Sequence, residues 1–73
     1  MRDLIIRTRN FQDRLTCHIN CEHILYVDGG QEGLYTTEQS AKGGARRFVH
    51  STDRIRWEKR TDDEGDYLRA VKR

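Results

Sequence analysis

The sulfur and imidazole side chains of this sequence are the ones best suited to binding a metal ion. Cys17, His18, Cys21 and His23 lie within seven residues, and His50 could complete a set of ligands. Zinc takes four such ligands in a tetrahedron, but zinc motifs commonly use Cys-x2-Cys, whereas the spacing here is Cys-x3-Cys. On an extended strand Cys17 and Cys21 would lie about 13 Å apart. We therefore expect two free thiols in the core and no cofactor, and zinc binding by Cys17, Cys21, His23 and His50 stays an open alternative.

Residue patterns typical of catalytic centres are missing from the sequence. Ser40 and Ser51 lack the Gly-x-Ser-x-Gly frame of a nucleophilic serine, and Cys17 and His18, as neighbours on a strand, would point to opposite faces. The glycine pairs are not followed by Gly-Lys-Ser/Thr. The acidic turn at 62–66 is too open to water to separate the pKa values of its carboxyl groups. We expect a protein that is not an enzyme and has no small-molecule substrate.

Basic residues are concentrated in one block of the chain. The whole sequence has 14 basic and 12 acidic residues, so the placement of charge matters more than its sum. Residues 39–60 contain seven basic and two acidic residues. A cationic surface of this kind attracts phosphates through counterion release, but it could equally bind an acidic protein surface or serve solubility alone. The residues expected to bind a partner are Arg7, Arg9, Lys42, Arg46, Arg47, Arg54, Arg56, Lys59 and Arg60, and those expected near nucleic acid are Arg69, Lys72 and Arg73.

Alternating apolar and polar residues predict strands on both sides of one helix. Strand patterns cover 4–9, 15–22, 24–27, 54–60 and 67–73, with a hairpin turn at 61–66. Leu34 and Tyr35 fit a short strand end or a packing anchor. These patterns predict the α+β class, in which a small antiparallel sheet of about five short strands, ordered β-β-β-α-β-β, packs against one helix.

The helix is predicted from about Thr37 to His50. Thr36 and Gln39 have the spacing of a capping box, with Thr36 as the N-cap. The expected inner stripe is Ala41, Gly44, Ala45 and Phe48, and we expect the two helix glycines to permit close approach to the sheet. Ile55 and Trp57 are expected to face inward from the following strand, and the other sheet face, rich in Arg, His and Tyr, to be exposed.

Length and hydropathy favour one cytoplasmic domain. The sequence spans 73 residues, the size of a single domain, and we expect flexibility in the first few residues and in the C-terminal basic tail. No apolar run approaches the roughly 20 residues that cross a bilayer, and the first residues do not form a signal peptide. Two cysteines without an export signal suggest a reducing compartment. We expect no membrane partner.

The second half of the chain resembles a class of small phage proteins. The segment Leu34–Ala41 leads into a short helix, and the Arg54–Arg60 strand and a hairpin follow. This layout, over roughly Tyr26 to Arg73, is similar to the β-α-β-β core of phage-encoded host-takeover proteins that inhibit or regulate bacterial RNA polymerase. Anti-CRISPR proteins have a similar size and layout. Several of the polymerase inhibitors are strongly acidic, so the basic block here argues against a DNA mimic.

The resemblance implies a non-enzymatic regulator in the cytoplasm of a bacterial host. Its partner would be a nucleic-acid machine, first of all RNA polymerase or another nucleoprotein complex, and its effect would be on transcription. A direct DNA- or RNA-binding module that uses the basic helix–strand face is the alternative, and an anti-CRISPR-type inhibitor is a further one. The partner's identity, the face that binds it, inhibition versus activation, and the oligomeric state stay open.

Overall fold

The sheet and helix are seen in a computed structural model, which describes the backbone of residues 2–12 and 19–73 and the side chains of residues 2–10 and 21–73. The elements in chain order are β1 (Leu4–Gln12), β2 (Ile19–Val27), β3 (Gly30–Tyr35), α1 (Glu38–Ala45), the 3-10 helix η1 (Arg46–Phe48), β4 (Ile55–Asp62) and β5 (Gly65–Lys72). The strands form one antiparallel sheet in the order β3-β2-β1-β5-β4. The predicted α+β class with the layout β-β-β-α-β-β is confirmed.

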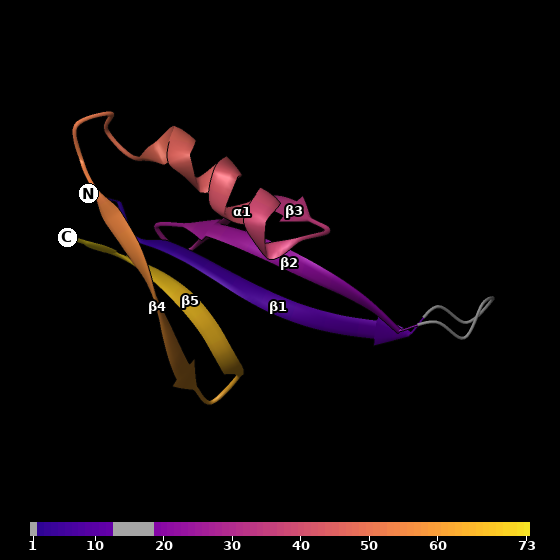
Figure 1. The fold of residues 1–73 in the computed structure, drawn as a ribbon. Helices are drawn as coiled ribbons and strands as arrows, with labels where there is room; N and C mark the ends of the chain where they lie inside the picture. The colour runs from indigo at the N-terminus through magenta and orange to yellow at the C-terminus, as the bar shows by residue number, and fades with distance from the viewer. Residues whose placement is uncertain (1, 13–18) are drawn as a thin grey trace.

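Tight turns join β2 to β3 and β4 to β5. Asp28 and Gly29, both with positive φ, connect β2 to β3, and such angles favour short polar residues and glycine. Asp63 and Glu64 connect β4 to β5, where Gly65 also has a positive φ of 111°. The chain between β3 and β4 passes over the sheet as α1 and η1, so β5 returns beside β1 rather than beside β3 (Figure 1).

The core lies between α1 and one face of the sheet. Leu4, Ile6, Leu25, Val27, Ala41, Ala45 and Ala70 are buried together, and Tyr35, Phe48, Val49, Ile55, Trp57 and Leu68 pack around them. Ala41 and Ala45 are fully buried, which confirms that they form the inner stripe of the helix. Ile55 and Trp57 face inward as predicted. Within the described residues, no helix is long and apolar enough to cross a membrane.

The helix is shorter than predicted and begins one residue later. Thr37, not Thr36, is the N-cap, and its hydroxyl oxygen accepts the Ser40 N–H at 3.1 Å. The α-helical turns end at Ala45, and η1 tightens the chain before Val49 becomes extended. The chain must leave the helix early because it still has to reach the start of β4 at the end of the sheet. The prediction of one helix as far as His50 was therefore wrong at this end.

The second and third strands also differ from their predicted bounds. Ile24–Val27 continues β2 instead of forming a strand of its own, and the third strand is β3, which includes Leu34 and Tyr35. A β-bulge between Leu25 and Tyr26 disturbs the pairing with β3. The part of the 15–22 prediction that covers residues 15–18 lies outside the described residues.

Only part of the helix-side face is covered. An eight-residue helix is about 12 Å long, whereas the molecule extends 45 Å along its longest axis. Thr8, Asn10 and Cys21 lie on the helix side beyond α1, and all three are exposed. The prediction that Cys21 is a core residue was wrong for this reason; Cys17 lies outside the described residues.

Gly44 permits the close contact between α1 and β3. A Cβ atom at this position would lie 2.0 Å from the Tyr35 hydroxyl oxygen and 2.5 Å from the ring carbon that bears it, whereas a Cβ at Gly43 would meet no atom within 4 Å. The expected close approach is therefore found at Gly44 alone.

We predict opposite effects of alanine at these two glycines. Gly44→Ala should destabilise the fold by about 1–3 kcal/mol, because the partly buried Tyr35 ring must move. Gly43→Ala should stabilise it by roughly 0.5–1 kcal/mol, because alanine favours the helix and nothing obstructs its methyl group. Chemical denaturation of both variants measures the difference. Equal free energies of unfolding would contradict the packing described for Gly44.

Candidate anion-binding site

Arg7 joins the two halves of the sheet. Its guanidinium makes two hydrogen bonds to the Asp62 carboxylate, one of 3.2 Å from Nη1 to Oδ1 and one from Nη2 to Oδ2. The guanidinium carbon also lies 4.6 Å from the centre of the Tyr67 ring, within the range of a cation–π contact. The Arg7 side chain is only 22% exposed. Although predicted to bind a partner, Arg7 lies in a contact between β1 and the β4–β5 hairpin.

The bond between Arg7 and Asp62 shifts both pKa values. The hydrogen bond from Arg7 lowers the pKa of Asp62, and the same bond raises the pKa of Arg7. The neighbouring Asp66 also has a lowered pKa, first because the Thr61 hydroxyl donates a hydrogen bond to it and then because Lys59 is close. Neighbouring donors and cations thus favour the charged forms of Asp62 and Asp66.

Most other cations in the described residues also have a carboxylate partner. Arg2 pairs with Asp28, Arg9 with Glu22, Lys42 with Glu38, Arg56 and Arg60 with Glu58, Lys59 with Asp66, Arg69 with Asp3, and Lys72 with Asp53. Exposed pairs of this kind are worth about 0–1 kcal/mol each, so they add little stability. They do neutralise much of the surface that the sequence predicts to be basic.

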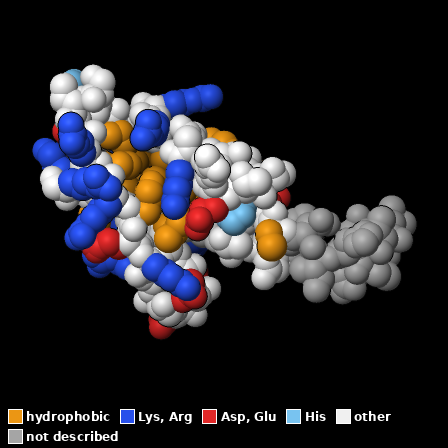
Figure 2. Space-filling model, viewed as in Figure 1, with side chains coloured by type: hydrophobic (Ala, Val, Ile, Leu, Met, Phe, Trp, Pro, Cys, Tyr) orange, Lys and Arg blue, Asp and Glu red, His pale blue; other side chains and the backbone are white. Residues whose placement is uncertain are grey.

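Four arginines have no carboxylate partner among the described residues. Arg46 and Arg47 lie in η1, Arg54 precedes β4, and Arg73 follows β5. All four are exposed. Lys and Arg side chains gather at the end of the molecule where both chain ends lie, at the left of the view (Figure 2). We call these four residues the arginine end.

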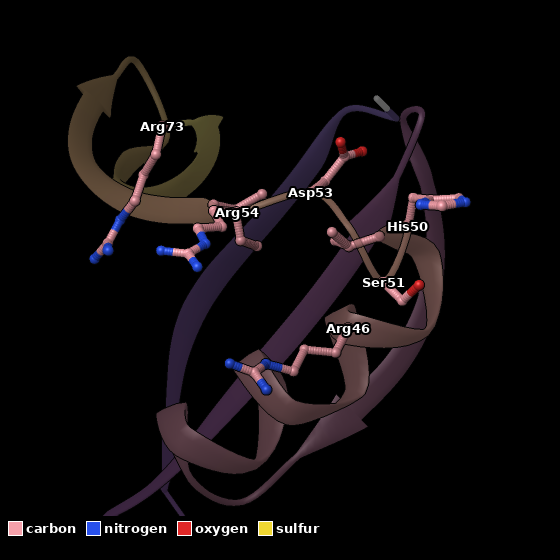
Figure 3. A pocket seen from close by; sticks show the side chains of 8 residues that line it. Arg46, His50, Ser51, Asp53, Arg54 and Arg73 are labelled. Carbon is pink, nitrogen blue, oxygen red and sulfur yellow. The ribbon is translucent and has the colours of Figure 1, made fainter.

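A hollow of about 380 Å³ lies within the arginine end. Arg46, Arg54 and Arg73 line it, together with Val49, His50, Ser51, Asp53 and Ile55. The three guanidinium groups extend toward one side of the hollow, and His50 and Ser51 extend toward the other (Figure 3). The Asp53 carboxylate forms an ion pair with Lys72 Nζ at 3.6 Å, so its charge is already balanced and does not neutralise the three arginines.

A second hollow, of about 430 Å³, lies between β1 and the β4–β5 hairpin. Three carboxylates line it, and each is close to a cation: Glu38 to Lys42, Glu64 to Arg7 and Asp66 to Lys59. This hollow therefore offers less unbalanced charge than the one in the arginine end.

The described cysteine and histidines do not form a metal site. Cys21 donates to Asn10 Oδ1 at 3.0 Å, and His23 Nδ1 lies 3.0 Å from the Thr8 hydroxyl. His50 Nδ1 accepts the Thr52 N–H at 3.2 Å, far along the chain from the other two. No group of three or more potential ligands occurs among the described residues. Cys17 and His18 lie outside them.

Comparison with known proteins gives no relative for this chain. No protein-family model matches it, and no curated protein or solved structure matches it.

The sequence analysis predicts that the arginines of the hollow bind a partner or lie near nucleic acid, but it does not predict that they line one hollow. Arg46 and Arg54 were assigned to the partner surface and Arg73 to a flexible tail near nucleic acid, whereas the structure brings the three together. The signal available in the sequence is positional: Arg46 follows the helix pattern, and Arg54 and Arg73 are at the open end of one predicted hairpin.

We predict that Asp62→Asn changes how the free energy of unfolding depends on pH in the acidic range. A lowered folded pKa means that ionised Asp62 contributes stability above its unfolded pKa of about 4, and that this contribution is lost as the pH falls through the lower folded value. Asp62→Asn should therefore be less stable at pH 7 and lose less stability below about pH 4. Asp63→Asn, in the adjoining turn, is the matched control and should follow the wild-type curve. Urea denaturation from pH 7 to pH 2 measures both, and parallel curves for Asp62→Asn and wild type would contradict the assignment.

Proposed function

We propose that this chain is a non-enzymatic domain that binds nucleic acid directly, with the arginine end in contact with phosphate groups. The observation that supports the proposal is the distribution of pairing. Nine of the described cations have carboxylate partners, and the four that lack one share one end of the molecule. An anionic partner would supply the negative charge that these four arginines do not receive from carboxylates of the described residues.

Phosphate suits the arginine end in both geometry and charge. A guanidinium presents a planar fork of N–H donors that matches two phosphate oxygens. Contacts with phosphates also release condensed counterions, so they favour binding without reading a sequence. We therefore expect affinity for DNA or RNA with little preference for base sequence.

The affinity for nucleic acid should fall steeply with salt. If four arginines contact phosphates of a duplex, the slope of log K against log salt should be about −3.6. The triple variant Arg46→Gln, Arg47→Gln, Arg54→Gln should reduce this slope by about 2.7 and weaken binding at low salt. Fluorescence anisotropy with a labelled duplex and a labelled single strand, across a salt series, measures both quantities.

A matched variant distinguishes the effect of where the charges lie from the effect of the net charge. Arg56→Gln, Lys59→Gln, Arg60→Gln removes the same three charges, but these residues pair with Glu58 and Asp66. This variant should retain most of the affinity and of the slope. Equal losses in the two triple variants, or no binding of wild type to either nucleic acid, would refute the proposal.

A second candidate function is a protein-binding regulator of a bacterial nucleic-acid machine such as RNA polymerase. The sheet face opposite α1 favours it. Leu34 is 52% exposed on β3, and it lies beside the buried Ile24 in the β2–β3 register. Tyr26 and Ile5, both partly exposed, form the neighbouring pair. An exposed leucine near an aromatic side chain suits the apolar centre of a protein interface. The anti-CRISPR-type inhibitor stays a prediction without an observation that favours it.

The second candidate predicts direct binding to purified bacterial RNA polymerase. Leu34→Ser should weaken that binding by about tenfold or more if this leucine is a buried anchor of the interface. Asn10→Ser, an exposed position on the other face of the sheet, is the control and should bind as wild type does. Biolayer interferometry with core enzyme and holoenzyme measures the affinities. No saturable binding to either form would eliminate this candidate.

A further inference from the structure

We infer that the hollow of the arginine end is a binding site for a single phosphate group, held jointly by Arg46, Arg54 and Arg73. This inference rests on the proposed function and adds a specific ligand group and a specific set of residues to it. Three features of the hollow support a phosphate ligand: the backbone that carries these arginines, the balance of charge, and the size.

The backbone holds the three arginines in place. Arg54 and Arg73 are side by side, because the Arg73 N–H donates to the Arg54 carbonyl oxygen at 2.9 Å. The Arg46 carbonyl oxygen accepts the Val49 N–H at 3.2 Å, and the Asp53 N–H donates to the His50 carbonyl oxygen at 2.9 Å. Two local turns thus shape the segment that connects η1 to β4. Folding places the backbone of the three arginines, which lowers the cost of gathering them around one ligand.

The charge around the hollow favours an anion with more than one charge. Three guanidiniums line it, and the one lining acidic side chain, Asp53, is paired with Lys72. Like charges at close range repel each other. A phosphate relieves this repulsion and accepts several N–H bonds, and each bond from an ionised donor is stronger than a neutral one.

The size of the hollow leaves room for the group that carries the phosphate. Its volume of about 380 Å³ falls in the range of small-ligand sites. Val49 and Ile55 give it an apolar wall, against which a sugar or base can lie. The phosphate can come from within a nucleic-acid strand or from its 5′ end, and the two sources share the chemistry that the arginines recognise.

Titration of the 15N-labelled protein with inorganic phosphate tests the inference. Sodium phosphate at pH 7, compared with sodium chloride of matched ionic strength, should shift the amide signals of residues 46–54 and 73 in a saturable way, with a Kd on the order of 1 mM. Arg46→Gln, Arg54→Gln and Arg73→Gln should each weaken phosphate binding by about tenfold. Arg47→Gln is the matched control, because Arg47 is in the same 3-10 helix and does not line the hollow; it should change the Kd by less than about twofold. Unchanged positions of distant amide signals show that each variant is folded.

The outcomes separate this inference from the proposed function. No saturable shift in wild type, or equal weakening by Arg47→Gln and the three lining variants, overturns the phosphate site even if nucleic acid still binds. Saturable phosphate binding in a protein that binds neither duplex nor single strand supports the site and refutes the proposed function. Two oligonucleotides of one sequence, with a 5′ phosphate or a 5′ hydroxyl, distinguish the sources. Tighter binding of the first assigns the site to a strand end, and equal binding assigns it to internal phosphates.

Discussion

The close packing of α1 against the sheet is the contact on which the rest of this structure depends. Ala41 and Ala45 are fully buried on the side of the helix that faces the sheet, and Gly44 lies where a methyl group would clash with Tyr35. Small residues at these positions bring the helix backbone near the strands, which a chain with 34% apolar residues needs for a dense core. Arg46 follows the helix directly, so the packing of the core places the backbone that carries one arginine of the arginine end.

Ion pairs then determine which charges are left for a partner. Arg7 and Asp62 are 55 positions apart in sequence, and their bond connects β1 to β4 across the intervening β5. The other pairs lie mostly between neighbouring strands or one helical turn apart, where side chains on one face meet. Strand and helix geometry thus neutralises the middle of the sheet. The η1 segment and the open end of the β4–β5 hairpin have fewer facing positions, and the unpaired arginines are found there.

The sequence was sufficient for those parts of the fold that depend on local patterns. Alternation predicted the β4–β5 hairpin and the inward faces of Ile55 and Trp57, and the α+β class followed. The sequence pattern predicted a helix in the right place but gave the wrong N-cap and too late an end. Periodicity does not decide whether Thr36 or Thr37 is the N-cap, and it does not show that the chain tightens into η1. It assigned Cys21 to the core because alternation gives the face of a strand but not the length of the helix that covers it. For the site, residue types indicated a basic surface, but the pairing of Arg7, Arg9 and Lys59 depends on a strand register that composition does not contain.

Solubility alone is a poor explanation for the arginine end. Charges that keep a small protein soluble work best when both signs are interspersed over the surface, and this arrangement is found over the middle of the sheet. The arginine end departs from it: guanidiniums from three segments share one hollow, and the nearby Asp53 bonds Lys72 rather than any of them. Grouping like charges adds self-repulsion to a fold whose net stability is small. An arrangement that costs stability and is built by tertiary structure is typical of a functional site, and an anion is the ligand that would remove the cost.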